Sequence, residues 1–99
     1  MWRLDKNYKA LRSQVPWLKR MPSEYIHDHC FFSTQPMDEP DHANDLIDLL
    51  DMIDAENFLM FASDYPHWDH DAPTEILKQL NPEARQKILY DNAKSLYKL

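Results

Sequence analysis

The fold of this chain is indicated most strongly by residues 58–69, which read Phe-Leu-Met-Phe-Ala-Ser-Asp-Tyr-Pro-His-Trp-Asp. The apolar run at the start suits a strand that is buried on both faces, as in a parallel sheet. The run ends abruptly at Asp64, which is followed by a Tyr-Pro turn and His67. Because ligands of parallel sheets gather at the carboxyl ends of the strands, Asp64 is predicted to lie at the edge of a functional site.

Apolar residues spaced three and four apart predict three amphipathic helices around this strand. Their apolar faces consist of Leu4, Tyr8, Leu11, Val15 and Leu18; of Ala43, Leu46, Ile47, Leu50 and Ile53; and of Ala84, Ile88, Leu89, Ala93 and Leu96. Strands are predicted at residues 30–34 and 57–63, and a short helix at residues 74–80. The resulting order of helix, strand, helix, strand, helix, helix predicts an α/β fold with a parallel strand pair and crossover helices.

Prolines and capping residues predict where these elements begin and end. Pro16 removes a backbone donor, so the first helix is expected to kink or end there. Residues 21–29 are expected to form a connector with a turn near its start. The middle and last helices are predicted to start at residues 38–40, Asp-Glu-Pro, and 81–83, Asn-Pro-Glu.

The middle helix carries a row of aspartates off its apolar face. The row consists of Asp41, Asp45, Asp48, Asp51 and Asp54. It is interpreted as a solvated outer face, with cation binding as the alternative.

Composition excludes several classes of partner. The net charge is −6, and nucleic-acid binding depends largely on Lys and Arg that neutralise phosphates, so no nucleic-acid partner is expected. No apolar segment of about 18 residues and no leader pattern is present, which predicts a soluble chain without a membrane partner. The single cysteine, Cys30, cannot form an internal disulfide and fits a cytoplasmic location.

Residues 58–69 and residues 88–97, Ile-Leu-Tyr-Asp-Asn-Ala-Lys-Ser-Leu-Tyr, together resemble the C-terminal end of a known family. The family is that of the amidohydrolase-related metal-dependent hydrolases and decarboxylases, which includes aminocarboxymuconate semialdehyde decarboxylase. Residues 11–18 are similar to the helix after the sixth barrel strand. Residues 22–25 and 30–36 are similar to the stretch around the seventh barrel strand, and residues 57–64 are similar to the eighth.

The resemblance implies that residues 1–99 form a C-terminal fragment of a (β/α)8 barrel, running from the helix after strand 6 to the C-terminus. A complete barrel of this type takes about 250 residues, whereas this chain has 99. We therefore expect a partial barrel domain.

The resemblance also implies roles for two residues of the loop after the last strand. Asp64 matches the position that ligates a divalent metal, most often zinc, and acts as acid and base, while His67 is a candidate substrate contact. Taken without the resemblance, Asp64 could equally cap the Tyr-Pro turn. The nearby Asp69, His70 and Asp71 are interpreted as polar surface residues, with a local zinc cluster as the alternative.

The His27–His29 pair and Cys30 are not expected to take part in a functional site. A His-x-His pair opens the metal site of the resembled family, but it lies on the first strand there, whereas His27 and His29 precede the segment similar to the seventh strand. Cys30 is expected to be a small buried strand residue, because no cationic neighbour in the sequence favours its thiolate.

Two hypotheses about function follow. The first is the C-terminal part of a metal-dependent hydrolase or decarboxylase that acts on a small carboxylate or cyclic substrate. Most of the metal ligands are absent from this chain, so it is expected to be inactive alone and to bind zinc weakly. The second is a non-catalytic small acidic α/β interaction module or split-enzyme subunit. Either hypothesis predicts self-association or a complementary barrel fragment as partner, because two strands leave open edges.

Overall fold

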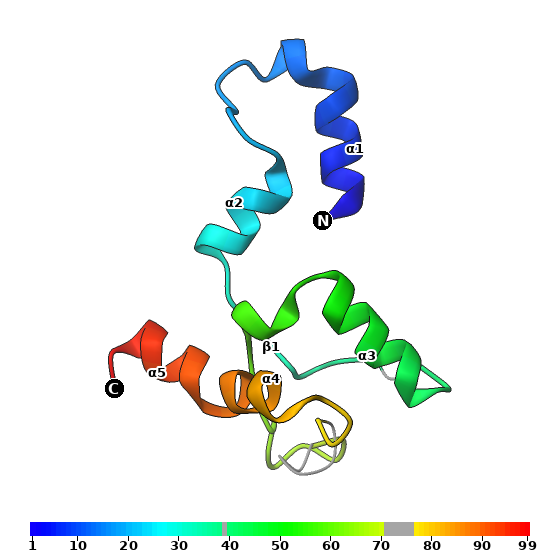
Figure 1. Ribbon diagram of the computed structural model, residues 1–99, viewed down its shortest axis with the longest axis vertical. Coiled ribbons are helices and arrows are strands. Elements are labelled where there is room, and N and C mark those ends of the chain that lie inside the picture. Colours follow the sequence, from blue (N-terminus) through cyan, green and yellow to red (C-terminus); the bar gives the residue numbers. More distant parts are fainter. Residues whose placement is uncertain (39, 71–76) are drawn as a thin grey trace. The chain divides into compact units, whose positions relative to one another are not determined.

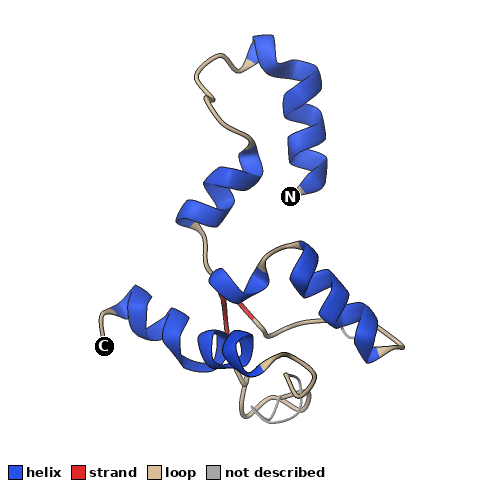
Figure 2. Ribbon diagram, viewed as in Figure 1, coloured by secondary structure: helices blue, strands red, loops and turns tan. Residues whose placement is uncertain are grey.

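The computed structural model describes residues 1–38, 40–70 and 77–99 of the chain (Figure 1). The chain forms two compact units, Met1–Cys30 and Phe31–Leu99. The first is helical, and the second combines helices with one pair of short strands (Figure 2). None of the helices in the described ranges has the length and apolar character needed to cross a membrane.

The first unit begins with α1 (Trp2–Leu11), which continues into the 3-10 turn η1 (Arg12–Gln14). Regular structure ends before Pro16, as predicted. On the predicted apolar face Tyr8 is buried, and its hydroxyl donates to the Leu18 carbonyl at 3.2 Å. Leu4 and Leu11 are exposed, so only part of that face is covered within this unit.

The prediction of a connector at residues 21–29 is wrong, because the helix α2 (Pro22–His29) forms there. Pro22 stands at the start of the helix, where its missing N–H costs nothing. Glu24 Oε2 accepts a hydrogen bond from the Met21 N–H at 2.7 Å. A proline followed two residues later by a glutamate is thus a helix-start signal that the sequence interpretation overlooked.

The two helices of this unit are joined by a carboxylate at a helix N-terminus. Asp5 Oδ1 of α1 accepts a hydrogen bond from the Ser23 N–H, in the first turn of α2, at 2.9 Å. The hydrogen bonds from Ser23 hold the pKa of Asp5 below its ordinary value of 3.8. The unprotonated carboxylate therefore stabilises the pairing of α1 with α2.

Acid is expected to loosen this helix pair. Because the folded-state pKa of Asp5 is lowered, its contribution is complete above the ordinary value of 3.8 and is lost as the pH falls through the folded pKa. Amide exchange and chemical shift of Ser23, followed by NMR from pH 5 downward, should report this loss. Asp5→Asn should remove the transition, and an unchanged transition in that variant would contradict the assignment.

The second unit is organised around a parallel strand pair, as predicted. The strands β1 (Phe32–Ser33) and β2 (Leu59–Met60) pair with Phe32 opposite Leu59 and Ser33 opposite Met60. Both strands are shorter than predicted, and the pairing is extended by a side chain. The buried Thr34 Oγ1 accepts from the Ala62 N–H at 3.0 Å and donates to the Ala62 carbonyl at 3.2 Å.

The connection between the strands contains α3 (Ala43–Met52) and the 3-10 turn η2 (Ala55–Asn57). The helix begins later than predicted; Glu39, within the predicted start, lies outside the described residues. Residues 40–42 are exposed and bury no apolar surface, and a helix is stabilised mainly by its packed face. Leu46 and Leu50 are buried on that face, and all five aspartates of the row are exposed, as predicted.

The C-terminal helical segment has three parts, α4 (Pro82–Gln86), the π-helical η3 (Lys87–Asp91) and α5 (Asn92–Tyr97). Asn81 Oδ1 accepts from the Ala84 N–H at 2.8 Å, which confirms the predicted cap. The π turn was not predicted. Part of the predicted short helix, residues 74–76, lies outside the described residues, and residues 77–80 form turns.

The apolar core of the second unit is built from β2, α3, η2, α4, η3 and the turns beside them, whereas both residues of β1 are exposed and α5 has no buried residue. The buried apolar residues are Leu46, Leu50, Ala55, Phe58, Leu59, Leu77, Leu80, Ala84 and Ile88. Leu96, expected on the buried stripe of the last helix, is exposed.

Candidate functional site

Asp64 lies beyond the carboxyl end of β2, at the same end of the parallel pair as Thr34, as predicted. Its backbone is left-handed, with φ of 55°. That conformation is uncommon outside glycine, although Asp tolerates it better than most residues. Residues held in such conformations cluster at active sites and ligand clamps, which makes the turn at Asp64 a candidate site.

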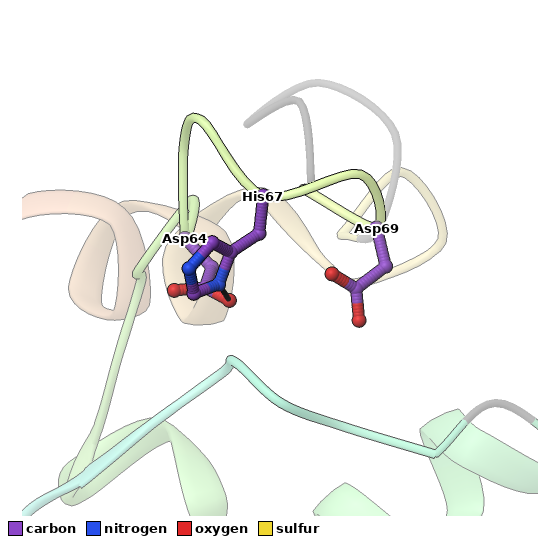
Figure 3. A group of neighbouring side chains, drawn as sticks. All are labelled: Asp64, His67 and Asp69. Atoms are coloured by element: carbon purple, nitrogen blue, oxygen red, sulfur yellow. Dashed lines mark hydrogen bonds and ion pairs between the residues drawn. The ribbon is translucent and has the colours of Figure 1, made fainter.

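Asp64 is directly hydrogen-bonded to His67 (Figure 3). Its Oδ2 atom lies 2.7 Å from His67 Nδ1, and the side chains are 38% and 69% exposed. An ionised carboxylate can only accept, so Nδ1 carries the proton of this bond. In the neutral ring, Nε2 is then left with its lone pair, available to a metal ion or a substrate proton.

Asp69 is the third member of this group. Its carboxylate and ligand atoms of Asp64 and His67 all lie within 4.8 Å of one another. The loop returns toward its start through two turns, in which the His67 N–H donates to the Asp64 carbonyl and the His70 N–H to the His67 carbonyl. The sequence interpretation placed Asp69 in an ordinary polar loop because sequence spacing does not show these turns.

Other residues in and near the loop stabilise its conformation. His70 Nδ1 lies 3.0 Å from the His67 carbonyl, and its ring meets Tyr65 edge-to-face. Gln35 Nε2 donates to the Asp69 carbonyl at 3.2 Å, which links the loop after β2 to the residues after β1. Asp71 lies outside the described residues.

The other sequence candidates lie in the first unit. His27 and His29 are both on α2. Side chains two residues apart on a helix do not face each other, which favours the ordinary interpretation of this pair. Cys30 is a half-buried free thiol that follows α2 and donates its N–H to the Ile26 carbonyl, so its assignment to a strand is wrong. Helix formation by residues 22–29 explains the difference.

The donor set of the loop has the chemistry of a divalent metal site. Two carboxylates and one imidazole are competent zinc ligands, and three protein ligands are the usual number at a catalytic zinc. Among the described residues, Asp64, His67 and Asp69 are the group of this kind with ligand atoms in mutual reach. The residues present thus fit a cation, although the group is open to solvent.

Comparison with known proteins gives one result for the whole chain. A search of curated proteins found no match. The sequence model of the family described as amidohydrolase matches residues 1–99. Since this match spans the entire sequence and the structure places Asp64 at the carboxyl end of a parallel strand, the chain belongs to the amidohydrolase family.

Proposed function

We propose that this chain is the C-terminal part of a metal-dependent hydrolase or decarboxylase with a (β/α)8 barrel. The observation that carries the proposal is Asp64, which stands at the carboxyl end of a parallel strand in a left-handed conformation and bonds to His67. The amidohydrolase family generally uses divalent metals and acts on small molecules. Small carboxylates or cyclic compounds are the substrates we expect.

In the assembled enzyme Asp64 would help to hold the metal, and His67 and Asp69 lie beside it on the same loop. A bound divalent ion supplies a water acidic enough to lose its proton near neutral pH. In this proposal the Asp64 carboxylate receives a proton from the reacting centre and later returns it, as a general acid and base. His67 orients that carboxylate through Nδ1 and presents Nε2 to the substrate.

Catalysis in this proposal requires further residues. A barrel site draws its catalytic groups from the ends of several strands, and the described residues contain one parallel pair. We therefore infer that the chain is inactive alone. The test is co-expression with a polypeptide that carries the preceding barrel strands: activity and tight metal binding in the complex support the proposal, and a stable complex with neither contradicts it.

The isolated chain is expected to bind zinc no more tightly than roughly micromolar, because its three donors are exposed and lie on one loop. Isothermal titration calorimetry at neutral pH measures this. His67→Ala is expected to change the weak binding more than His70→Ala, since the His70 ring packs against Tyr65. Tight stoichiometric binding that is lost in His67→Ala would instead establish a self-sufficient loop site.

A second candidate function is a non-catalytic interaction module. It is favoured by the aromatic rings that the second unit leaves in solvent: Tyr65, Trp68, Phe31 and Phe32 are all exposed. Under this proposal the chain acts through self-association or by binding a complementary fragment. A stable, cooperatively melting monomer in light scattering and calorimetry, with no gain of activity from added barrel strands, would favour the partner-binding form of this function over the first proposal and would contradict self-association.

A further inference from the structure

The two edges of the parallel pair are not equivalent. Phe32 N–H donates to the Phe58 carbonyl at 3.0 Å, and Thr34 N–H to the Met60 carbonyl at 2.9 Å. Because backbone groups alternate in direction along a strand, the groups of Leu59 and Phe61 point away from β1. They form the outer edge of β2, where a further strand would pair.

This outer edge is occupied by the C-terminal helical segment of the same chain. Asn92 Nδ2 donates to the carbonyls of Leu59 and Glu56, both at 2.8 Å. The Phe61 N–H donates to the Ile88 carbonyl at 2.9 Å. One acceptor and one donor of the strand edge are therefore satisfied by a helix instead of a strand.

The π turn makes the Ile88 carbonyl available. In an α-helix this carbonyl would accept the N–H of Asn92, four residues later. Here the Asn92 N–H bonds to the Lys87 carbonyl, five residues earlier. The wider turn thus frees the acceptor that Phe61 uses.

A charged contact anchors the same segment beside the strand. Lys87 Nζ lies 2.6 Å from Glu56 Oε1 and 3.3 Å from Asn57 Oδ1, so η3 is tied to the turn η2 that leads into β2. The Glu56 carboxylate raises the pKa of Lys87 above its ordinary value. Lysine at this position stays protonated at neutral pH and keeps the contact.

In the described part of the second unit, no residue covers the outer edge of β1 in this way. Ser33 points its N–H away from β2 and has no acceptor in the part of the chain that the structure describes. The adjacent rings of Phe31 and Phe32 are 38% and 46% exposed. The described residues therefore contain one covered and one open strand edge.

We propose that residues 87–92 block the outer edge of β2, so that another strand cannot pair with it; we call these residues the guard. A strand can join that edge only after Asn92 and Ile88 have left it, whereas no described residue of the second unit covers the β1 edge. Sheet-to-sheet association of this chain is then limited to pairs of molecules, because a molecule with one free edge cannot extend a sheet indefinitely. A complementary barrel fragment would have to displace the guard to pair with β2.

Hydrogen exchange of the unmodified chain tests the guard directly. Phe61 and Ser33 both carry an amide on the outer side of their strands, and the first alone has an acceptor among the described residues. The Phe61 amide should exchange at least about tenfold more slowly than the Ser33 amide after correction for intrinsic rates. Equal rates in NMR exchange measurements at neutral pH would overturn the proposal.

Asn92→Asp provides the second test, because a carboxylate cannot donate and would face two carbonyl oxygens. Phe61 exchange should accelerate about tenfold, and sedimentation velocity should reveal species larger than the pairs formed by the unmodified chain. Asn44→Asp makes the same chemical change on the exposed part of α3 and should alter neither measurement. A folded Asn92→Asp variant that keeps slow Phe61 exchange and an unchanged size distribution would overturn the proposal.

Discussion

Asp64→Asn is expected to lower the turnover of the enzyme assembled from this chain and the preceding barrel strands by roughly 10² to 10⁴-fold. The amide keeps the size of the side chain but can neither accept a proton from the reacting centre nor carry the charge that a metal requires. Hydrolysis of p-nitrophenyl acetate and carbon dioxide release from a panel of ring carboxylic acids would measure the loss in both reaction classes.

Asp69→Asn is the matched control for this substitution. Asp69 belongs to the same loop and lies within reach of the same ion, but it follows the strand by several more residues and has no counterpart in the catalytic role proposed for Asp64. We expect a markedly smaller loss of turnover in this variant. Equal losses in the two variants, or an active Asp64→Asn enzyme, would contradict the assignment of proton transfer to Asp64.

Leu50→Ala is expected to destabilise the second unit by about 2 to 5 kcal/mol. Leu50 is 5% exposed on the inner face of α3, so truncation removes buried apolar contacts and leaves a cavity. Proteins of this size have a total stability of only about 5 to 15 kcal/mol, so the variant should lose a large part of its free energy of unfolding. Urea denaturation followed by circular dichroism measures the change.

Leu49→Ala makes the identical substitution one residue earlier in the same helix, where the side chain is 43% exposed. The helix propensities of the two variants change in the same direction, so the difference between them isolates burial. We expect Leu49→Ala to change the stability by less than about 1 kcal/mol. A similar loss in both variants would mean that α3 does not pack on the core of the second unit through the face of Leu46 and Leu50.

The candidate site could be located from sequence because its main signals are local. An apolar run that ends at an aspartate indicates a buried strand and the functional edge of a parallel sheet, and the structure places Asp64 there. The cap at Asn81 and the exposed row of aspartates on α3 are likewise consequences of short-range chemistry and helical periodicity. The helix at residues 22–29 is also encoded locally, in Pro22 and Glu24, but proline is common in turns as well, so Pro22 does not by itself distinguish a helix start from a turn.

By itself, the sequence determined the alternation of strands and helices, the parallel pair and the position of Asp64, because periodicity and chain direction specify these features. Only the tertiary structure decided that Asp69 joins Asp64 and His67, and that Asn92 and the Ile88 carbonyl cover the edge of β2. The first group depends on the turns of one loop, which residue spacing does not show. The contacts at the edge of β2 join different elements, and a hydrogen bond across about 30 residues leaves no periodic trace in the sequence. The backbone N–H and C=O groups at a strand edge need hydrogen-bond partners. Which groups supply them depends on how the elements pack and not on the local sequence pattern.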